Sequence, residues 1–245
     1  MQNLSLIVPV WNEDQNVQLL AEEIASSLAG KVEKYELIFI DDHSTDKTYE
    51  VITSLTQHYP IKLFAKKGKQ GKAYSLLEGF KHAQYDLVCM IDADLQYSPK
   101  YIPVMIQKIE KGADIVVANR YIYKGGLIRK ICSKAFNFVF VQLLHGFNVD
   151  AQSGLKVFRR SVTEHIEVNP SPWTFDLEFL LKARHANYII SSVNIEFIKR
   201  HAGESKIAVL KSSYEIGLSA IKLRLFMTYK EKSASLPVPT SKFAH

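Results

Sequence analysis

The first 120 residues alternate between short apolar segments and longer segments with apolar positions at helical spacing, which constrains the fold more than any other feature. The strand-like segments are residues 4–8, 35–40, 61–64, 86–91 and 114–120. The helix-like segments between them are residues 17–28, 48–59, 73–80 and 101–111. This alternation predicts an α/β domain with a mostly parallel sheet, helices on both of its faces, and a ligand site outside the carboxyl ends of the strands.

Charged side chains follow several of the predicted strands and should therefore meet at one edge of the sheet. They are Glu13, Asp41, Asp42, Asp92, Asp94 and Arg120. Asp92, Asp94 and Gln96 follow the fourth predicted strand at alternate positions, and in an extended segment such residues project to the same side. Mg²⁺ and Mn²⁺ prefer oxygen ligands and usually keep positions open for substrate phosphates. An Asp-x-Asp pattern also occurs in turns whose carboxylates cap backbone N–H groups, but the other polar strand ends favour a metal site.

A basic loop at residues 66–72 precedes the third predicted helix. Its glycines and lysines lack the spacing G-x-x-x-x-G-K-[ST], which excludes the phosphate loop of an ATPase or kinase. A basic loop that leads into a helix N-terminus still favours an anion, because the backbone N–H groups and the helix dipole are positive there.

The second half of the chain is less regular. We expect a helix at 129–144, on which Arg129 and Ser133 share a face, and a loop with a short strand at 150–156. A helix at 173–184 carries Asp176 and Glu178, and a strand follows at 188–197. A basic stretch comes next and contains Lys199, Arg200, His201, Ser205 and Lys206.

Residues 207–232 form an amphipathic segment with an apolar stripe beside basic residues. Such a stripe usually packs on a domain, and the competing interpretation is a basic helix that lies on an anionic membrane. Residues 233–245 are rich in Ser and Pro and are expected to be a mobile tail. The predicted organisation is therefore one domain at 1–206, the amphipathic segment, and the tail.

The composition agrees with one large domain, since 47% of the 245 residues are hydrophobic and 23% are charged. A net charge of +6 favours an anionic partner without separating nucleic acid, membrane and nucleotide. Cys89 and Cys132 lie in apolar surroundings, which predicts buried free thiols and a reducing compartment. No signal peptide or membrane span is recognisable, so we expect a cytoplasmic protein that is soluble or bound to the inner face of the membrane.

Five motifs occur in order between residues 4 and 206. They are PVWNE at 9–13, FIDDHSTD at 39–46, DADLQ at 92–96, GADIVVANRY at 112–121 and FIKRHAGESK at 197–206. Together they resemble the family 2 glycosyltransferases, most closely the dolichyl- and polyprenyl-phosphate sugar synthases. The resemblance implies the GT-A nucleotide-diphospho-sugar transferase fold, in agreement with the alternation. His43 and Lys47 depart from the family pattern, which often has Gly at these positions.

The resemblance also implies a set of site residues. Those expected to bind the nucleotide-sugar donor are Pro9, Val10, Trp11, Asn12, Glu13, Asp41, Asp42, Lys72, Asp92, Ala93, Asp94 and Arg120. Those expected around an acceptor phosphate are Arg120, Arg129, Ser133, Arg200, Ser205 and Lys206. Asp92, Asp94 and Gln96 would hold Mg²⁺ or Mn²⁺ against the diphosphate, and the expected catalytic residues are Asp92, Asp94 and Glu178.

The expected reaction is inverting transfer of a hexose, mannose first and glucose second, from GDP-mannose or a UDP-hexose to polyprenyl or dolichyl phosphate. A lipid monophosphate has a second pKa of about 6, by analogy with phosphorylated side chains, so it arrives charged and needs positioning more than proton removal. Glu178 is then a donor-sugar ligand or an orienting carboxylate, with the role of general base as the alternative.

Two other functions compete with this one. A saccharide or glycolipid hydroxyl is the alternative acceptor within the family. The alternative outside the family is a non-catalytic nucleotide- or RNA-binding protein, although no RNA-binding motif is recognisable and no nucleic-acid partner is expected.

Overall fold

The computed structural model describes residues 1–123, 148–171, 174–198 and 201. Its strands are β1 (Asn3–Val10), β2 (Lys34–Asp41), β3 (Ile61–Ala65), β4 (Leu87–Met90), β5 (Ile115–Tyr123), β6 (Lys156–Arg159) and β7 (Ile190–Phe197). Its helices are α1 (Val17–Leu28), α2 (Thr48–Leu55), α3 (Lys72–His82), the short 3₁₀ helix η1 (Pro99–Tyr101), α4 (Ile102–Glu110), α6 (Arg160–His165) and α7 (Phe175–His185).

The strands form one mostly parallel sheet in the order β3-β2-β1-β4-β6-β5-β7. β6 is the exception, because it pairs antiparallel with both β4 and β5. Its first residue, Lys156, pairs with Met90 at the end of β4 and with Val117 in β5. β6 therefore starts at the edge where the parallel strands end.

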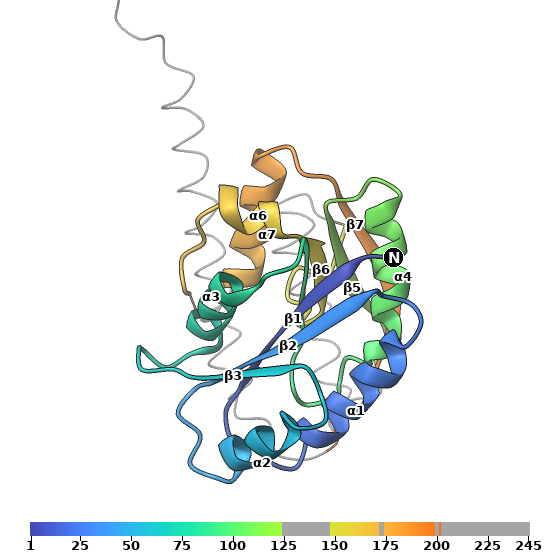
Figure 1. Cartoon of the computed structure of the whole chain (residues 1–245). Helices are drawn as coiled ribbons and strands as arrows, with labels where there is room; N and C mark the ends of the chain where they lie inside the picture. Colours follow the sequence, from blue (N-terminus) through green and yellow to red (C-terminus); the bar gives the residue numbers. More distant parts are fainter. Residues whose placement is uncertain (124–147, 172–173, 199–200, 202–245) are drawn as a thin grey trace, which may run out of the picture.

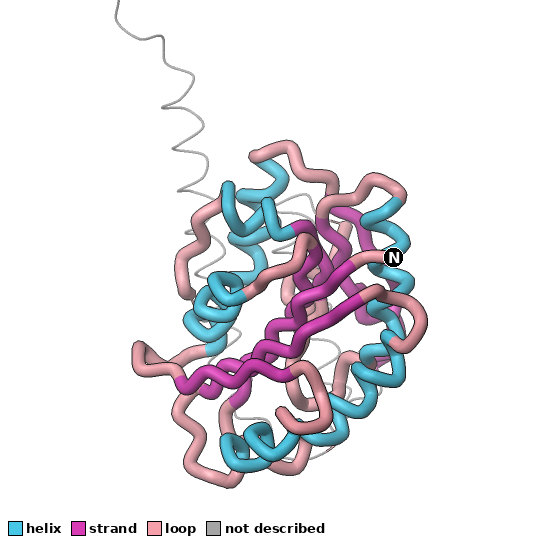
Figure 2. Tube along the Cα trace, viewed as in Figure 1, coloured by secondary structure: helices cyan, strands magenta, loops and turns pink. Residues whose placement is uncertain are grey.

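Helices cover both faces of the sheet, as the sequence predicts (Figures 1 and 2). α1, α2 and α4 pack on one face against alternate residues of β1 such as Leu4, Leu6 and Val8. α3, α6 and α7 pack on the other face, against Ile7 and the buried residues of β4 and β5 that point the same way. The two apolar cores fix the sheet between the helix layers and leave its carboxyl edge to carry polar side chains.

Several element boundaries differ from the predictions. α2 ends at Leu55 instead of reaching residue 59, because the chain turns there, and the N–H groups of His58 and Tyr59 both bond to the Leu55 carbonyl. β6 begins at Lys156, where the predicted short strand was expected to end, and α6 was not predicted. Cys89 is buried with a free thiol, and burial raises its pKa.

Four predicted features lie outside the described residues. They are the helix at 129–144, Cys132, the amphipathic segment at 207–232, and the tail at 233–245. Within the described part of the chain, no helix is long and apolar enough to cross a membrane.

Candidate active site

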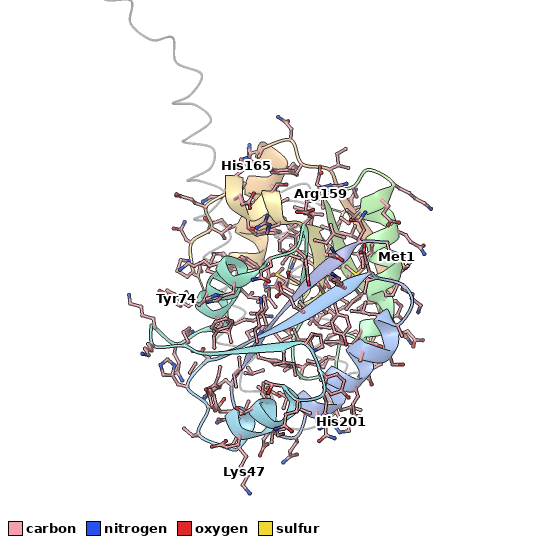
Figure 3. The ribbon with its side chains drawn as sticks, viewed as in Figure 1. Met1, Lys47, Tyr74, Arg159, His165 and His201 are labelled. Atoms are coloured by element: carbon pink, nitrogen blue, oxygen red, sulfur yellow. The ribbon has the colours of Figure 1, made fainter. Side chains whose placement is uncertain are left out.

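The polar ends of the parallel strands meet at one end of the molecule. Figure 3 shows Lys47, which follows β2, and His201, which follows β7, toward this end, whereas Arg159 and His165 lie toward the other. The predicted site residues that the structure describes at strand ends therefore share one edge of the sheet.

The loops after β1 and β2 are tied together by hydrogen bonds. The backbone N–H of Asn12 donates to Ser44 Oγ at 3.0 Å, and the N–H of Glu13 donates to Thr48 Oγ1 at 2.8 Å. Asp42 N donates to the carbonyl of Val10 at 2.8 Å, which aligns the two strand ends. Trp11 is 41% exposed beside them. The residues predicted to bind the base and ribose are thus adjacent.

His43 takes up the left-handed backbone conformation that glycine favours, with a φ of 65°. The departure from the family's Gly at this position therefore leaves a turn with positive φ in place. Lys47 has a φ of −83°, so its backbone conformation does not require glycine.

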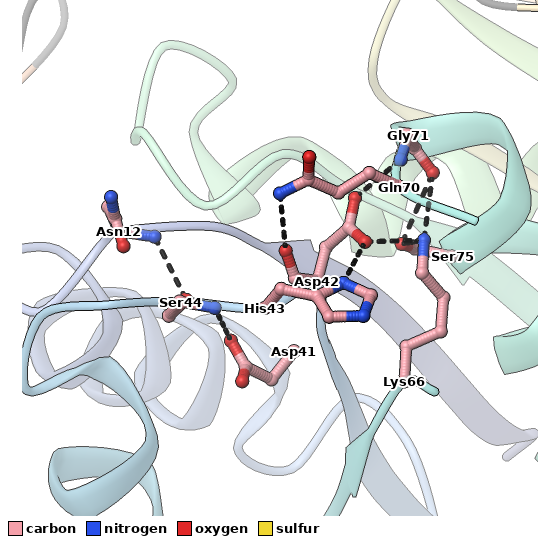
Figure 4. A network of polar contacts seen from close by, with 9 residues as sticks. All are labelled: Asn12, Asp41, Asp42, His43, Ser44, Lys66, Gln70, Gly71 and Ser75. Atoms are coloured by element: carbon pink, nitrogen blue, oxygen red, sulfur yellow. Dashed lines mark hydrogen bonds and ion pairs between the residues drawn. The ribbon is translucent and has the colours of Figure 1, made fainter. Parts of the chain in front are cut away.

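Asp42 connects the end of β2 to the basic loop (Figure 4). Its carboxylate pairs with Lys66 Nζ at 2.6 Å, accepts from the N–H of Gly71 at 2.7 Å, and lies 3.3 Å from His43 Nδ1. Lys66 also donates to the carbonyl of Gly71 and to Ser75 Oγ. Because Gly71 precedes α3, this network fixes the position of the first residue of that helix, Lys72.

The Asp-x-Asp segment is a turn, so the prediction of an extended segment was wrong here. β4 ends at Met90, and Leu95 has a φ of 61°. Asp94 Oδ1 accepts from the N–H of Gln96 at 3.0 Å, which is the capping role that the sequence also allowed. Asp94 and Gln96 are buried, whereas the side chain of Asp92 is 27% exposed.

Asp92 is one of four charged side chains, two carboxylates and two ammonium groups, that form two ion pairs near the ends of β4 and β6. Lys72 Nζ, at the start of α3, pairs with an oxygen of Asp92. Lys156 Nζ, in β6, donates to Asp176 Oδ1 of α7 at 2.6 Å and to the carbonyl of Ser153 at 2.5 Å. Lys72 is 44% exposed, and its partial burial would lower its pKa, but the carboxylates of Asp92 and Asp176 outweigh this effect and raise that pKa. Burial lowers the pKa of Lys156, whose side chain is fully buried.

Gly154 lies directly against Asp92. A Cβ at this position would be 2.1 Å from Asp92 Oδ2 and 3.0 Å from a ring carbon of Tyr97, so only glycine fits. The hydroxyl of Tyr97 hydrogen-bonds to the Gly154 backbone, and burial raises the pKa of Tyr97 to about 12. The loop before β6 thus packs directly against the Asp-x-Asp turn.

Arg120 is held at the same edge by Asp150. Its Nε and Nη2 both donate to the Asp150 carboxylate, Nη2 at 2.8 Å, and its guanidinium lies 5.3 Å from the ring centre of Phe197. This bidentate geometry fixes the orientation of the side chain.

The segment after β7 meets the Asp-x-Asp turn. Gln96 Nε2 donates to the carbonyl of Ile198 at 3.3 Å, and His201 N donates to the carbonyl of Asp94 at 3.3 Å. His201, a member of the predicted basic stretch, is therefore adjacent to the predicted metal-binding turn. The other members Lys199, Arg200, Ser205 and Lys206, and likewise Arg129 and Ser133, lie outside the described residues.

Glu178 lies on a different side of α7 from Asp176, as expected for helix residues two positions apart. Its buried carboxylate accepts from Asn169 Nδ2 at 2.8 Å and pairs with Lys182 at 2.7 Å. The carboxylate of α7 that interacts with the Lys72 ammonium is Asp176. The catalytic role of Glu178 stays a prediction.

The residues around the Asp-x-Asp turn fit a divalent cation. Asp92, Asp94 and Gln96 carry hard oxygen atoms, and Asp92 already pairs with a positive charge, the ammonium of Lys72. Among the described residues, no group of three His, Cys, Asp or Glu side chains gathers for a metal. Two carboxylates and an amide leave room for phosphate oxygens in the coordination shell, as is usual for Mg²⁺.

Sequence reasoning missed Gly154, Lys156, Asp150 and the position of Asp176. Lys156 carries the one available signal, a charged residue within the apolar run of residues 155–158. The contacts of Gly154 and Asp150 join segments far apart in the chain, so no local pattern reveals them.

Known proteins resemble the chain in sequence. The model of the family described as glycosyl transferase family 2 matches residues 5–167. A dolichol-phosphate mannosyltransferase from Pyrococcus furiosus is 34% identical over 212 residues, which are 83% of this chain and 59% of that protein. An undecaprenyl-phosphate 4-deoxy-4-formamido-L-arabinose transferase from Photorhabdus laumondii is 27% identical over 213 residues, covering 86% and 65% of the two chains. The chain thus spans less than two thirds of the length of these relatives.

Solved structures with the same fold include glucosyl-3-phosphoglycerate synthase from Mycobacterium tuberculosis. Its complex with Mg²⁺ and UDP has a TM-score of 0.70 at 18% identity and covers 91% of this chain and 79% of that one. Its complex with Mn²⁺, UDP-glucose and phosphoglyceric acid has a TM-score of 0.67 at 17% identity, with the same coverage. The predicted GT-A fold is confirmed. Since the family model also covers more than half of the 245 residues, the chain belongs to glycosyl transferase family 2.

Proposed function

We propose that the chain transfers a hexose, mannose first and glucose second, from its nucleoside diphosphate to a polyprenyl or dolichyl phosphate, with Mg²⁺ or Mn²⁺ bound. The observation that carries the proposal is the contact of His201 and Ile198 with the Asp94–Gln96 turn. It brings His201, a member of the basic stretch, beside the turn proposed to hold the donor diphosphate. The relatives are named for dolichol phosphate and undecaprenyl phosphate, which supports a lipid phosphate as the acceptor.

The described residues divide the work of binding. Trp11, Asp41 and Asp42 lie where the ends of β1 and β2 are joined and are proposed to hold the base and ribose. Asp92, Asp94 and Gln96 are proposed to hold the divalent cation, which when bound stabilises the negative charge that develops on the departing nucleoside diphosphate. Lys72 adds a positive charge at the same place.

The acceptor needs no strong base. A phosphate monoester with a second pKa of about 6 is largely ionised near neutral pH. Its attacking oxygen must be oriented toward the anomeric carbon, and arginine suits this because its planar fork donates in parallel to phosphate oxygens. Arg120, already oriented by Asp150, is proposed to contribute from the described part of the site.

A thermal-shift screen of GDP and UDP, each with and without Mn²⁺, tests donor binding. A ligand at 100 times its dissociation constant stabilises by about 2.7 kcal/mol, so the correct nucleotide should raise the melting temperature by about 5–10 °C. We expect this shift only with metal, and a shift of equal size without metal would contradict the metal role. The screen also identifies the base.

Transfer of radiolabelled hexose from the donor so identified tests the acceptor. We expect label on polyprenyl phosphate, and label only on saccharide or glycolipid acceptors would favour the alternative. Asp94→Asn removes a charge but retains an oxygen for the Gln96 N–H, and transfer should be lost. Asp86→Ala is the matched control, because that carboxylate is 94% exposed and precedes β4 at the opposite edge of the sheet. Full activity of Asp94→Asn would refute the assignment.

Attachment to the inner face of the cytoplasmic membrane is a further part of this proposal. The amphipathic segment at 207–232 that would make the contact lies outside the described residues. Sedimentation of the full chain with anionic and with neutral lipid vesicles tests it, and equal binding to both or to neither would contradict a basic helix as the anchor.

A further inference from the structure

The ammonium of Lys72 occupies a position at Asp92 where a divalent cation would bind. The side chains are 44% and 27% exposed, so the pair is open to solvent and not sealed in the core. Its geometry is nevertheless built by the fold. Lys72 is the first residue of α3, and the preceding Gly71 is fixed by its N–H bond to Asp42 at 2.7 Å.

The other oxygen of Asp92 faces the backbone. A Cβ on Gly154 would be only 2.1 Å from Oδ2, so the chain closes that side of the carboxylate. The remaining oxygen, Oδ1, is the one that pairs with Lys72. A cation approaching Asp92 therefore meets the ammonium at the open side, and two positive charges on one oxygen repel each other.

We propose that Lys72 is a resident counter-ion of Asp92 and that a divalent cation displaces it. The inference rests on the metal dependence in the proposed function. Displacement costs free energy when the metal binds alone. It costs less when a nucleoside diphosphate arrives with the metal, because the diphosphate supplies negative charge for both cations. Metal and donor then bind cooperatively, and the site stays charge-balanced before they arrive.

Mn²⁺ binding measured by the electron paramagnetic resonance of the free ion tests the competition without any activity assay. Lys72→Met should bind Mn²⁺ about tenfold more tightly than the unchanged protein in the absence of nucleotide, since a unit charge at 4 Å already changes an affinity roughly fivefold in bulk water. The gain in Mn²⁺ affinity on adding GDP or UDP should shrink in this variant. Lys72→Arg, which keeps the charge, should resemble the unchanged protein.

Lys69→Met is the matched control. Lys69 is exposed in the same basic loop and makes no ion pair with any described residue, so its removal changes the net charge equally without freeing Asp92. Its Mn²⁺ affinity should stay within about twofold of the unchanged protein, as expected for a solvated charge. Equal or weaker binding by Lys72→Met, or an equal gain in Lys69→Met, would overturn the inference. If neither the unchanged protein nor any variant binds Mn²⁺, even with GDP or UDP, the proposed metal dependence fails together with the inference. Mn²⁺ binding without the expected effect of Lys72→Met refutes the inference alone.

Discussion

Asp176→Asn tests how strongly the buried ammonium of Lys156 depends on its carboxylate. Lys156 is fully buried and donates to Asp176 Oδ1 at 2.6 Å and to the Ser153 carbonyl at 2.5 Å. Removing one partner of a buried ion pair typically costs about 3–5 kcal/mol, because it leaves a desolvated charge. For a chain of this size we expect the melting temperature to fall by roughly 6–20 °C.

The reverse substitution, Lys156→Met, should cost less. Asp176 is 22% exposed and keeps its interaction with Lys72, so its charge remains solvated and compensated. Methionine fills most of the lysine volume, and the loss should be about 1–2 kcal/mol for the two hydrogen bonds. The double variant with both Asp176→Asn and Lys156→Met should then be more stable than Asp176→Asn alone.

Urea unfolding followed by circular dichroism at pH 7 and pH 10 provides the assay. Burial lowers the pKa of Lys156, so its folded value lies below its unfolded value, more so once Asp176 is neutral. Between those values the unfolded chain binds more protons, and the free energy of unfolding of Asp176→Asn should rise with pH relative to the unchanged protein. A Lys156→Met variant that loses as much stability as Asp176→Asn, or a deficit in Asp176→Asn that does not shrink at pH 10, would refute the reasoning.

Three further substitutions test other parts of the structure. Gly154→Ala places a Cβ 2.1 Å from Asp92 Oδ2 and should displace that carboxylate. Because a small misplacement of a catalytic group can cost about a hundredfold in rate, we expect transfer in a radiolabel assay to fall at least that much. Activity within a few-fold of normal would contradict the close contact. Glu36→Gln removes a 2.7 Å pair with Lys62 and should cost about 1–3 kcal/mol at pH 7. Burial would raise the pKa of Glu36, but the pair with Lys62 and the other hydrogen bonds outweigh it and lower that pKa. The stabilisation is therefore present above the unfolded pKa and is lost as the pH falls through the folded pKa. Urea titrations should show the stability deficit of Glu36→Gln shrinking toward pH 3, and a deficit that stays constant with pH would argue against the pair. His43→Val should lower the melting temperature more than His43→Gly, because a β-branched residue tolerates a φ of 65° poorly. The opposite order would contradict a positive φ at position 43.

Local patterns in the sequence determined the framework of the protein. The apolar periods of residues 4–120 predicted the parallel strands and the helices on both faces, because strand and helix spacing are properties of short segments. The same patterns placed Asp41, Asp42, Asp92 and Asp94 at strand ends. Parallel pairing then made these ends meet at one edge without further information.

The tertiary structure alone decided which groups touch. β6 lies between β4 and β5 because of pairings across the sheet, and only this insertion puts Gly154 against Asp92 and Lys156 beside Met90 at the end of β4. The prediction focused on Glu178, yet the side chain of α7 that interacts with Lys72 is Asp176, since helix rotation against the sheet sets that choice. Contacts between segments far apart in the chain depend on how whole elements pack, and no spacing within one segment records them.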